Sequence, residues 1–146
     1  MDRLNADKLF ESFPRVRIDV DNAAFYEGLL EHKVIINRCD DCGHWHQPPR
    51  PLCPKCWSWS LTPTEVSGEG TVALVTVLRQ GPRRPGVDYS DGYAVVAVDL
   101  DEQRGLRLAG GIVGTPASEL RIGDRVRLLI REDDGSAPRL GFEVVR

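Results

Sequence analysis

The stretch CDDCGHWHQPPRPLCPKC, residues 39–56, contains all four cysteines of the 146-residue chain. Cys39 and Cys42 form one CxxC pair, and Cys53 and Cys56 form a second pair, with ten residues between the two. Each pair can form a tight turn, and two such turns supply the four soft ligands that tetrahedral Zn²⁺ prefers. The spacing therefore predicts a metal site of four cysteines. Zinc is the expected metal, and iron in a rubredoxin-like site is the alternative.

The predicted metal is structural rather than catalytic. A catalytic zinc keeps one coordination position open, whereas four thiolates close the coordination sphere. A thioredoxin-type redox centre is disfavoured because its CxxC pair begins a helix in a βα unit, and no such helix is evident here. His44 and His46 flank Trp45, and we expect them to face solvent. No Ser/His/Asp, Cys/His or paired-carboxylate arrangement can be assembled from the rest of the chain, so no catalytic residue is predicted.

Composition restricts the class of protein further. The net charge is −3 and the isoelectric point is about 5.6. This balance argues against a general polyanion binder, which needs a surplus of Lys and Arg on its binding face. The N-terminus lacks the pattern of a signal peptide, and no stretch approaches the ~18 apolar residues of a membrane-spanning helix. We therefore expect a soluble cytoplasmic protein without a membrane partner, where paired cysteines are more often metal ligands or redox centres than disulfides.

Residues 67–146 are predicted to form an all-β domain. Five segments are of strand length and rich in Val, Leu and Ile: 71–80, 92–100, 105–114, 124–132 and 138–145. Turn residues separate these segments. Five short strands, with a helical turn expected at 116–120, match a five-stranded OB-fold barrel better than a sandwich of about seven strands.

The section before the cysteines, 1–32, is acidic and predicted to be partly helical. Within DNAAFYEGLLEH, residues 21–32, Asp21 is the expected N-cap. Four apolar residues at spacing i, i+4 form a stripe on this helix: Phe25, Tyr26, Leu29 and Leu30. The stripe either packs on its own domain or docks on another protein chain. Residues 33–66 follow with a short strand-like run and the cysteines.

The segment RQGPRRPGVDYSDG, residues 79–92, is a second candidate site. Arg79, Arg83 and Arg84 are expected to gather at one mouth of the barrel, near Tyr89. Guanidinium groups can hold a phosphate through paired hydrogen bonds, as in a nucleotide or the 3′-phosphate of coenzyme A. The alternative is an ordinary solvated loop.

The order of these features resembles one family. The run FYEGLLEHKVIINRCDDCGHWHQPPRPLCPKC (25–56), followed by EVSGEGTVALVTV (65–77), GYAVVAVDLDE (92–102) and LRIGDRVRL (120–128), is similar to the acyl-CoA-associated zinc-ribbon/OB-fold proteins. The resemblance implies an N-terminal helical hairpin, a rubredoxin-like zinc ribbon whose ligands are the four cysteines, and a C-terminal OB barrel. It also implies a partner with a thiolase fold, such as a thiolase, a hydroxymethylglutaryl-CoA synthase or a retro-aldolase acting on acyl-CoA.

The sequence thus predicts a mainly β protein with a helical docking segment (1–32), a zinc ribbon (33–66) and an OB barrel (67–146). The expected function is that of a non-catalytic accessory subunit. It would join a thiolase-fold enzyme in a hetero-oligomer, with a heterotetramer as the expected stoichiometry and a CoA thioester at the interface. One alternative is a nucleic-acid-binding protein, which needs stacking aromatics on the barrel strands, where Phe142 is the only aromatic near mid-strand. Another is a free-standing enzyme acting on CoA thioesters.

Overall fold

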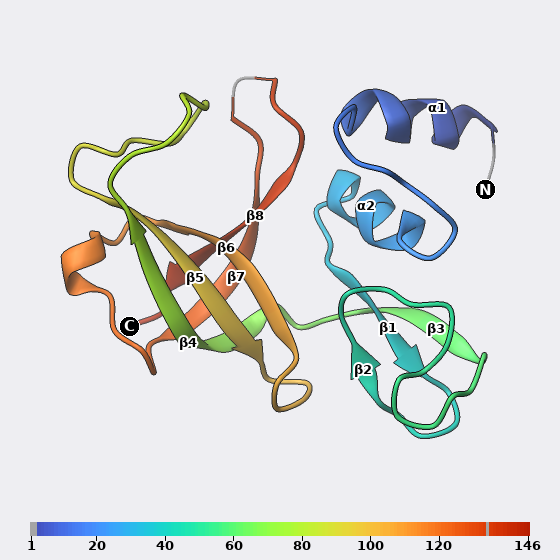
Figure 1. Ribbon diagram of the computed structural model, residues 1–146. Coiled ribbons are helices and arrows are strands. Elements are labelled where there is room, and N and C mark those ends of the chain that lie inside the picture. Colours follow the sequence, from blue (N-terminus) through green and yellow to red (C-terminus); the bar gives the residue numbers. More distant parts are fainter. Residues whose placement is uncertain (1–2, 134) are drawn as a thin grey trace. The chain divides into compact units, whose positions relative to one another are not determined.

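The chain folds into two compact units, Met1–Val66 and Ser67–Arg146 (Figure 1). The computed structural model describes residues 3–133 and 135–146, and side chains from residue 6 onward. Residues 1 and 2 of the predicted docking segment therefore lie outside the described residues. The mainly β architecture with an N-terminal helical segment, predicted from the sequence, is confirmed.

The first unit contains two helices and a small antiparallel sheet. Helix α1 (Arg3–Ser12) and helix α2 (Ala23–Leu30) precede strands β1 (Ile35–Cys39), β2 (Trp45–His46) and β3 (Leu61–Glu65). The strand order is β2-β1-β3. The helical segment (1–32) and the cysteine-bearing segment (33–66), predicted as separate sections, thus share one unit.

Helix α2 begins differently from the prediction. Its N-cap is Asn22, and not Asp21 as predicted, and no side chain caps the helix. The preceding turn explains the difference. The backbone N–H of Asn22 donates to Oδ1 of Asp19 (3.1 Å), and the N–H of Asp19 donates to Oδ1 of Asn22 (2.9 Å). This reciprocal pair fixes the chain just before the helix and sets its first residue.

The core of the first unit joins helix and strand residues. Leu9, Phe13, Leu29, Val34 and Ile36 are buried. Gly28 permits the close approach of α2 to β1, because a Cβ at this position would lie 2.6 Å from Cγ1 of Ile35. The apolar face of α2 is therefore used at least in part inside its own unit.

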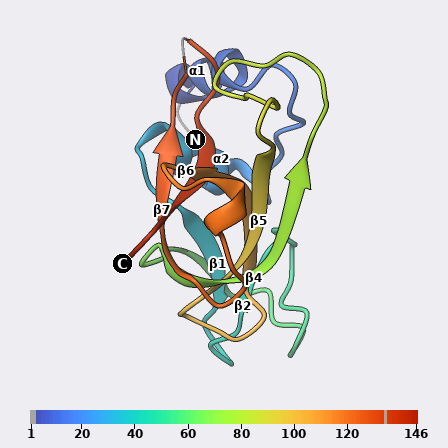
Figure 2. The ribbon, with the colours of Figure 1, turned by 90° about the vertical axis from the view of Figure 1, so that its left-hand side faces the viewer.

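The second unit is a closed five-stranded barrel, the OB fold predicted from the sequence (Figures 1 and 2). Its strands are β4 (Glu69–Leu78), β5 (Tyr93–Leu100), β6 (Arg107–Val113), β7 (Arg125–Arg131) and β8 (Arg139–Val144). They follow the order β4-β5-β6-β8-β7, with β6 and β8 parallel, and β4 closes onto β7. A single 3₁₀ turn, η1 (Ala117–Glu119), lies where the helical turn was expected.

Alternation along the strands produces the barrel core. In β5, Ala94, Val96, Val98 and Leu100 point inward and are buried, whereas the intervening residues are half-buried. Phe142 of β8 is fully buried inside the barrel. This aromatic ring therefore packs in the core and is not available for stacking with a base.

No helix in the part of the chain that the structure describes is both long and apolar enough to cross a membrane.

Candidate metal centre and neighbouring surfaces

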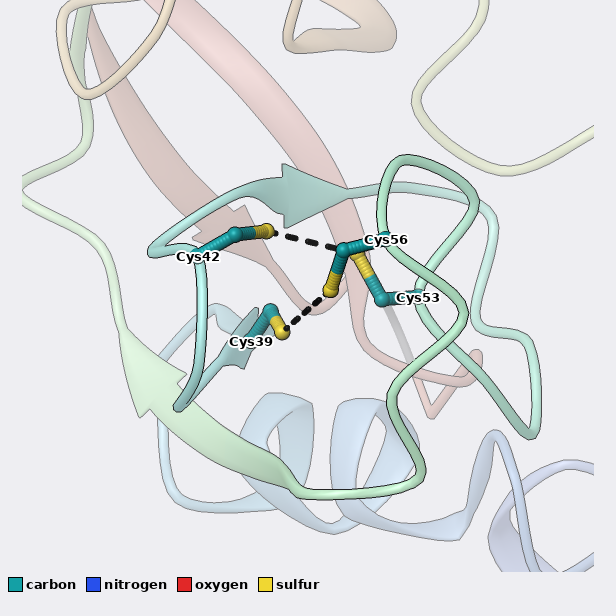
Figure 3. A group of neighbouring side chains, drawn as sticks. All are labelled: Cys39, Cys42, Cys53 and Cys56. Atoms are coloured by element: carbon teal, nitrogen blue, oxygen red, sulfur yellow. Dashed lines mark hydrogen bonds between the residues drawn. The ribbon is translucent and has the colours of Figure 1, made fainter.

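The four cysteine sulfurs converge on one point in the first unit (Figure 3). All four Sγ atoms lie within 4.8 Å of one another, with Cys39 and Cys56 3.6 Å apart and Cys42 and Cys53 3.6 Å apart. Four sulfurs bound at the usual Zn–S distance lie about 3.8 Å from each other in a tetrahedron. The four cysteines predicted from the sequence are thus positioned to bind a metal, and their geometry fits a closed tetrathiolate site.

Two backbone turns of the same design hold the sulfurs. In the first turn the N–H of Gly43 donates to the carbonyl of Cys39, and in the second the N–H of Trp57 donates to the carbonyl of Cys53, both at 2.9 Å. Gly43 and Trp57 both lie in the left-handed region, with φ of 72° and 64°. Glycine adopts this conformation freely, whereas a bulky side chain does so at a cost of about 1–2 kcal/mol.

The thiols of Cys53 and Cys56 differ in pKa. Burial raises the pKa of the Cys53 thiol, but hydrogen bonds from the N–H groups of Cys56 and Lys55 and from the Cys42 thiol outweigh it and lower that pKa to about 7. The N–H of Ser58 lowers the pKa of Cys56, but burial and the neighbouring thiols raise it to about 12. A divalent ion would hold all four as thiolates, so metal binding releases protons.

Two aspartates of the first turn connect it to the chain beyond the second turn. The hydroxyls of Ser60 (2.8 Å) and Thr62 (2.7 Å) donate to the carboxylate of Asp40. The same bonds, that of Thr62 first, lower the pKa of Asp40. The hydroxyl of Ser58 donates to Asp41. Asp40 and Asp41 therefore hold the segment after Cys56 against the first turn.

One expectation about the histidines is wrong. His46 is buried and does not face solvent. Burial lowers its pKa, so the ring is neutral at pH 7. On β2, His46 pairs with Asn37 of β1, and in this short sheet the side chain of His46 points toward the interior of the unit. A strand of two residues is too short for a period-2 pattern, so the sequence does not indicate which of its faces is covered.

The predicted docking stripe of α2 is only partly open to solvent. Leu29 is buried, and Phe25, Tyr26 and Leu30 are half-buried. The Tyr26 ring packs on Phe13 with 5.0 Å between centroids. Phe25 and Tyr26 also line a depression with Asp21 and Pro48. Any contact of this stripe with another chain would therefore involve its half-buried members.

The most exposed large aromatic side chains of the first unit lie elsewhere, at Trp57 (76% exposed) and Trp59 (74%). The sequence alone assigned no role to these two residues. The two CxxC turns are equivalent, and Gly43 shows that glycine suits the position directly after the second cysteine. A tryptophan at the same position of the second turn is the signal that could have identified Trp57.

In the second unit, Arg79, Arg83 and Arg84 are all exposed on the loop 79–92. Tyr89 lies in the same loop, where its hydroxyl donates to the carbonyl of Pro82 (3.2 Å). Exposure is compatible with both predictions for these arginines, a phosphate site and a solvated loop.

This loop is fastened to the hairpin of β7 and β8 by a cluster that the sequence did not reveal. Arg139 donates to the carbonyl of Pro85 (2.6 Å), and Arg131 donates to the carbonyl of Gly86 (3.3 Å). Asp133 forms ion pairs with both guanidinium groups. The bond from Arg139, with the nearby charges of both arginines, holds the pKa of Asp133 below its usual value. The middle of the loop is therefore fixed to the barrel.

A closed cysteine cluster in a small three-stranded sheet, followed by an OB barrel, defines the class of zinc-ribbon/OB-fold proteins. Two family models match the chain: the rubredoxin-like zinc ribbon domain of ChsH2 at residues 27–61, and the C-terminal OB-fold domain of ChsH2 at residues 63–131. The chain belongs to the ChsH2/DUF35 family, as the resemblance predicted.

Relatives in this family are subunits and scaffolds. A probable enoyl-CoA hydratase alpha subunit of Thermomonospora curvata is 34% identical over 91% of this chain, which spans only 39% of that protein. A DUF35 domain-containing scaffold protein of Methanocaldococcus jannaschii is 30% identical over 67% of this chain and 69% of its own length. The solved structure of the Ltp2-ChsH2(DUF35) aldolase contains a chain that is 32% identical, with a TM-score of 0.77, covering 89% of this chain and 98% of that one.

Proposed function

We propose that this protein is a non-catalytic accessory subunit that binds a thiolase-fold acyl-CoA enzyme and supports its site. The observation that carries the proposal is the closed cysteine cluster, because four converging sulfurs leave a metal without an open position for substrate. In this proposal the metal is Zn²⁺ and its work is to hold the ribbon. The Ltp2-ChsH2(DUF35) aldolase and the scaffold proteins among the relatives support the assignment to an enzyme complex.

A site for coenzyme A at the interface is part of the proposal. Arg79, Arg83 and Arg84 would hold phosphate, and the contacts of Arg131 and Arg139 to the loop carbonyls would keep those arginines in place. A fixed loop loses less conformational freedom on binding than a mobile one. The half-buried residues Phe25, Tyr26 and Leu30 are proposed to contact the partner, whereas Leu29 supports them from inside.

Co-expression tests the assignment. The chain is produced with the thiolase-fold enzyme encoded nearest to it, and the complex is isolated through a tag on the enzyme. We expect co-purification, hetero-oligomeric mass, and acyl-CoA turnover that needs both proteins. Turnover by the purified chain alone would contradict the proposal. The enzyme's turnover remaining the same with and without the chain would also contradict it.

The arginines are tested separately. Replacing all three by alanine is expected to raise the KM for the CoA thioester at least tenfold without dissociating the complex, since each phosphate contact from a charged donor is worth about 1.5–3 kcal/mol. Dephospho-CoA thioesters should be insensitive to the replacement. An equal rise in KM for both thioesters would show that the loop does not bind the 3′-phosphate.

A nucleic-acid-binding function is the weaker alternative. The net charge is negative, and Phe142 is inside the barrel. Salt-sensitive binding of a single-stranded oligonucleotide by the purified chain would favour it.

A further inference from the structure

Two tryptophans beside the metal centre are unusually exposed. Trp57 and Trp59, here called the tryptophan pair, expose 76% and 74% of their surface. Trp45, in the same ribbon, is half-buried, and the guanidinium of Arg38 lies 5.5 Å from the centre of its ring. A large apolar surface left in solvent often marks an interaction site. The tryptophan pair thus requires an explanation that the ribbon core does not provide.

The backbone at Trp57 strengthens this point. Gly43 occupies the equivalent position of the first cysteine turn, makes the equivalent hydrogen bond and has nearly the same φ. Glycine therefore satisfies everything the turn requires. A tryptophan in the left-handed region is disfavoured, and its side chain gains little burial in return. Because folding does not favour Trp57, its side chain is expected to act outside the chain.

The backbone that carries the tryptophan pair is held by hydrogen bonds. Ser58, between the two tryptophans in the sequence, accepts a hydrogen bond at its carbonyl from the N–H of Cys53 (2.9 Å), and its hydroxyl donates to Asp41. The N–H of Ser60 donates to the hydroxyl of Ser58 (3.0 Å). A backbone that is already ordered loses little conformational entropy on docking, and tryptophan is enriched among the residues that dominate interface energies.

The charge around the pair selects among binding partners. Asp40 and Asp41 are exposed, and four thiolates around a divalent ion carry two further negative charges. These negative charges exceed the two positive charges of Lys55, in the second turn, and Arg38, which donates to the carbonyl of Gly43 in the first turn. Such a surface repels the phosphates of nucleic acids and anionic lipids, and it favours a partner with Lys or Arg near the contact.

We propose that the tryptophan pair is the anchor through which the ribbon docks into an apolar pocket of a partner protein, with basic residues on the rim of that pocket. This inference rests on the proposed function for the identity of the partner, the thiolase-fold enzyme. It adds the surface by which that enzyme is held.

The test compares the affinity of variants for the enzyme encoded nearest to this chain, using the full-length, metal-loaded protein. Trp57→Gly restores the residue found in the first turn, so the melting temperature should stay the same or rise. Affinity for the enzyme should fall at least about 30-fold, as expected for an interface residue of this kind. Trp59→Ser should weaken binding likewise. Ile122→Ser removes an apolar side chain that is 68% exposed in the barrel unit, and it should leave affinity unchanged.

The outcomes separate the two proposals. If the native chain binds the enzyme and both tryptophan variants bind equally well, the anchor is refuted and the proposed function stands. If the native chain fails to bind the enzyme, the proposed function fails. Binding to phosphatidylserine-containing vesicles or to an oligothymidine that is lost in Trp57→Gly, while enzyme affinity stays unchanged, would refute the protein anchor. A lower melting temperature with unchanged affinity would show that Trp57 is a structural residue.

Discussion

Removal of the metal is expected to unfold the ribbon and leave the barrel intact. The perturbation is either a chelator or Cys53→Ser, which removes a fully buried ligand. Within the ribbon, Val34, Ile36 and Val66 are the buried aliphatic residues, and together they contribute about 4.5–9 kcal/mol. A structural zinc contributes on the order of 10 kcal/mol or more, which exceeds that contribution. The barrel belongs to the other compact unit and has its own core.

Amide hydrogen exchange measures this prediction residue by residue. The N–H groups of Cys39, Gly43, Cys53 and Trp57 are hydrogen-bonded within the two turns. In the metal-free protein we expect their protection to fall to that of an unfolded chain, while the amides of β5 keep theirs. Added Zn²⁺ should restore protection in the chelated native protein but not in Cys53→Ser. Full protection of the turn amides without metal would show that the ribbon is stable without its metal and would contradict this prediction.

Three further variants test the fold around the candidate sites. Phe142→Ala should destabilise the barrel by about 3–5 kcal/mol in denaturant unfolding, because the ring is fully buried. Gly28→Val should cost about 1–3 kcal/mol and lower the melting temperature of the first unit, since its Cβ would lie 2.6 Å from Ile35. Asp133→Asn should speed amide exchange in the loop 79–92 and cost about 1 kcal/mol. Because the pKa of Asp133 is lowered from 3.8 by Arg139, the loop contacts should persist above that pH and be lost as the pH falls further below it.

The barrel and the cysteine cluster could be predicted because their signals are local. Alternation over eight residues, as in β5, shows both that a strand forms and which face is covered. The CxxC pairs likewise show four ligands through spacing alone. Both features were found where the sequence placed them.

Features that depend on contacts distant in the sequence were not predicted. The helical stripe showed which residues of α2 are apolar, but not that Tyr26 would pack on Phe13. Nothing in the local sequence joins Asp133 and Arg139 to the loop around Gly86. Asn22, and not Asp21, is the N-cap because Asp19 and Asn22 hydrogen-bond to each other. N-cap propensity alone does not show which of several neighbouring polar residues will occupy the position.

Metal coordination and the backbone conformation of Trp57 depend on each other. An unconstrained chain would move Trp57 out of the left-handed region, since that conformation costs about 1–2 kcal/mol. The turn keeps it there because Cys53 and Cys56, on the same turn, converge with the cysteines of the first turn. A closed metal site contributes several times the free energy that this conformation costs. The same coordination that leaves no position for substrate thus fixes the backbone from which an exposed aromatic side chain projects. Such a fixed backbone suits the proposed role of Trp57 in binding a partner.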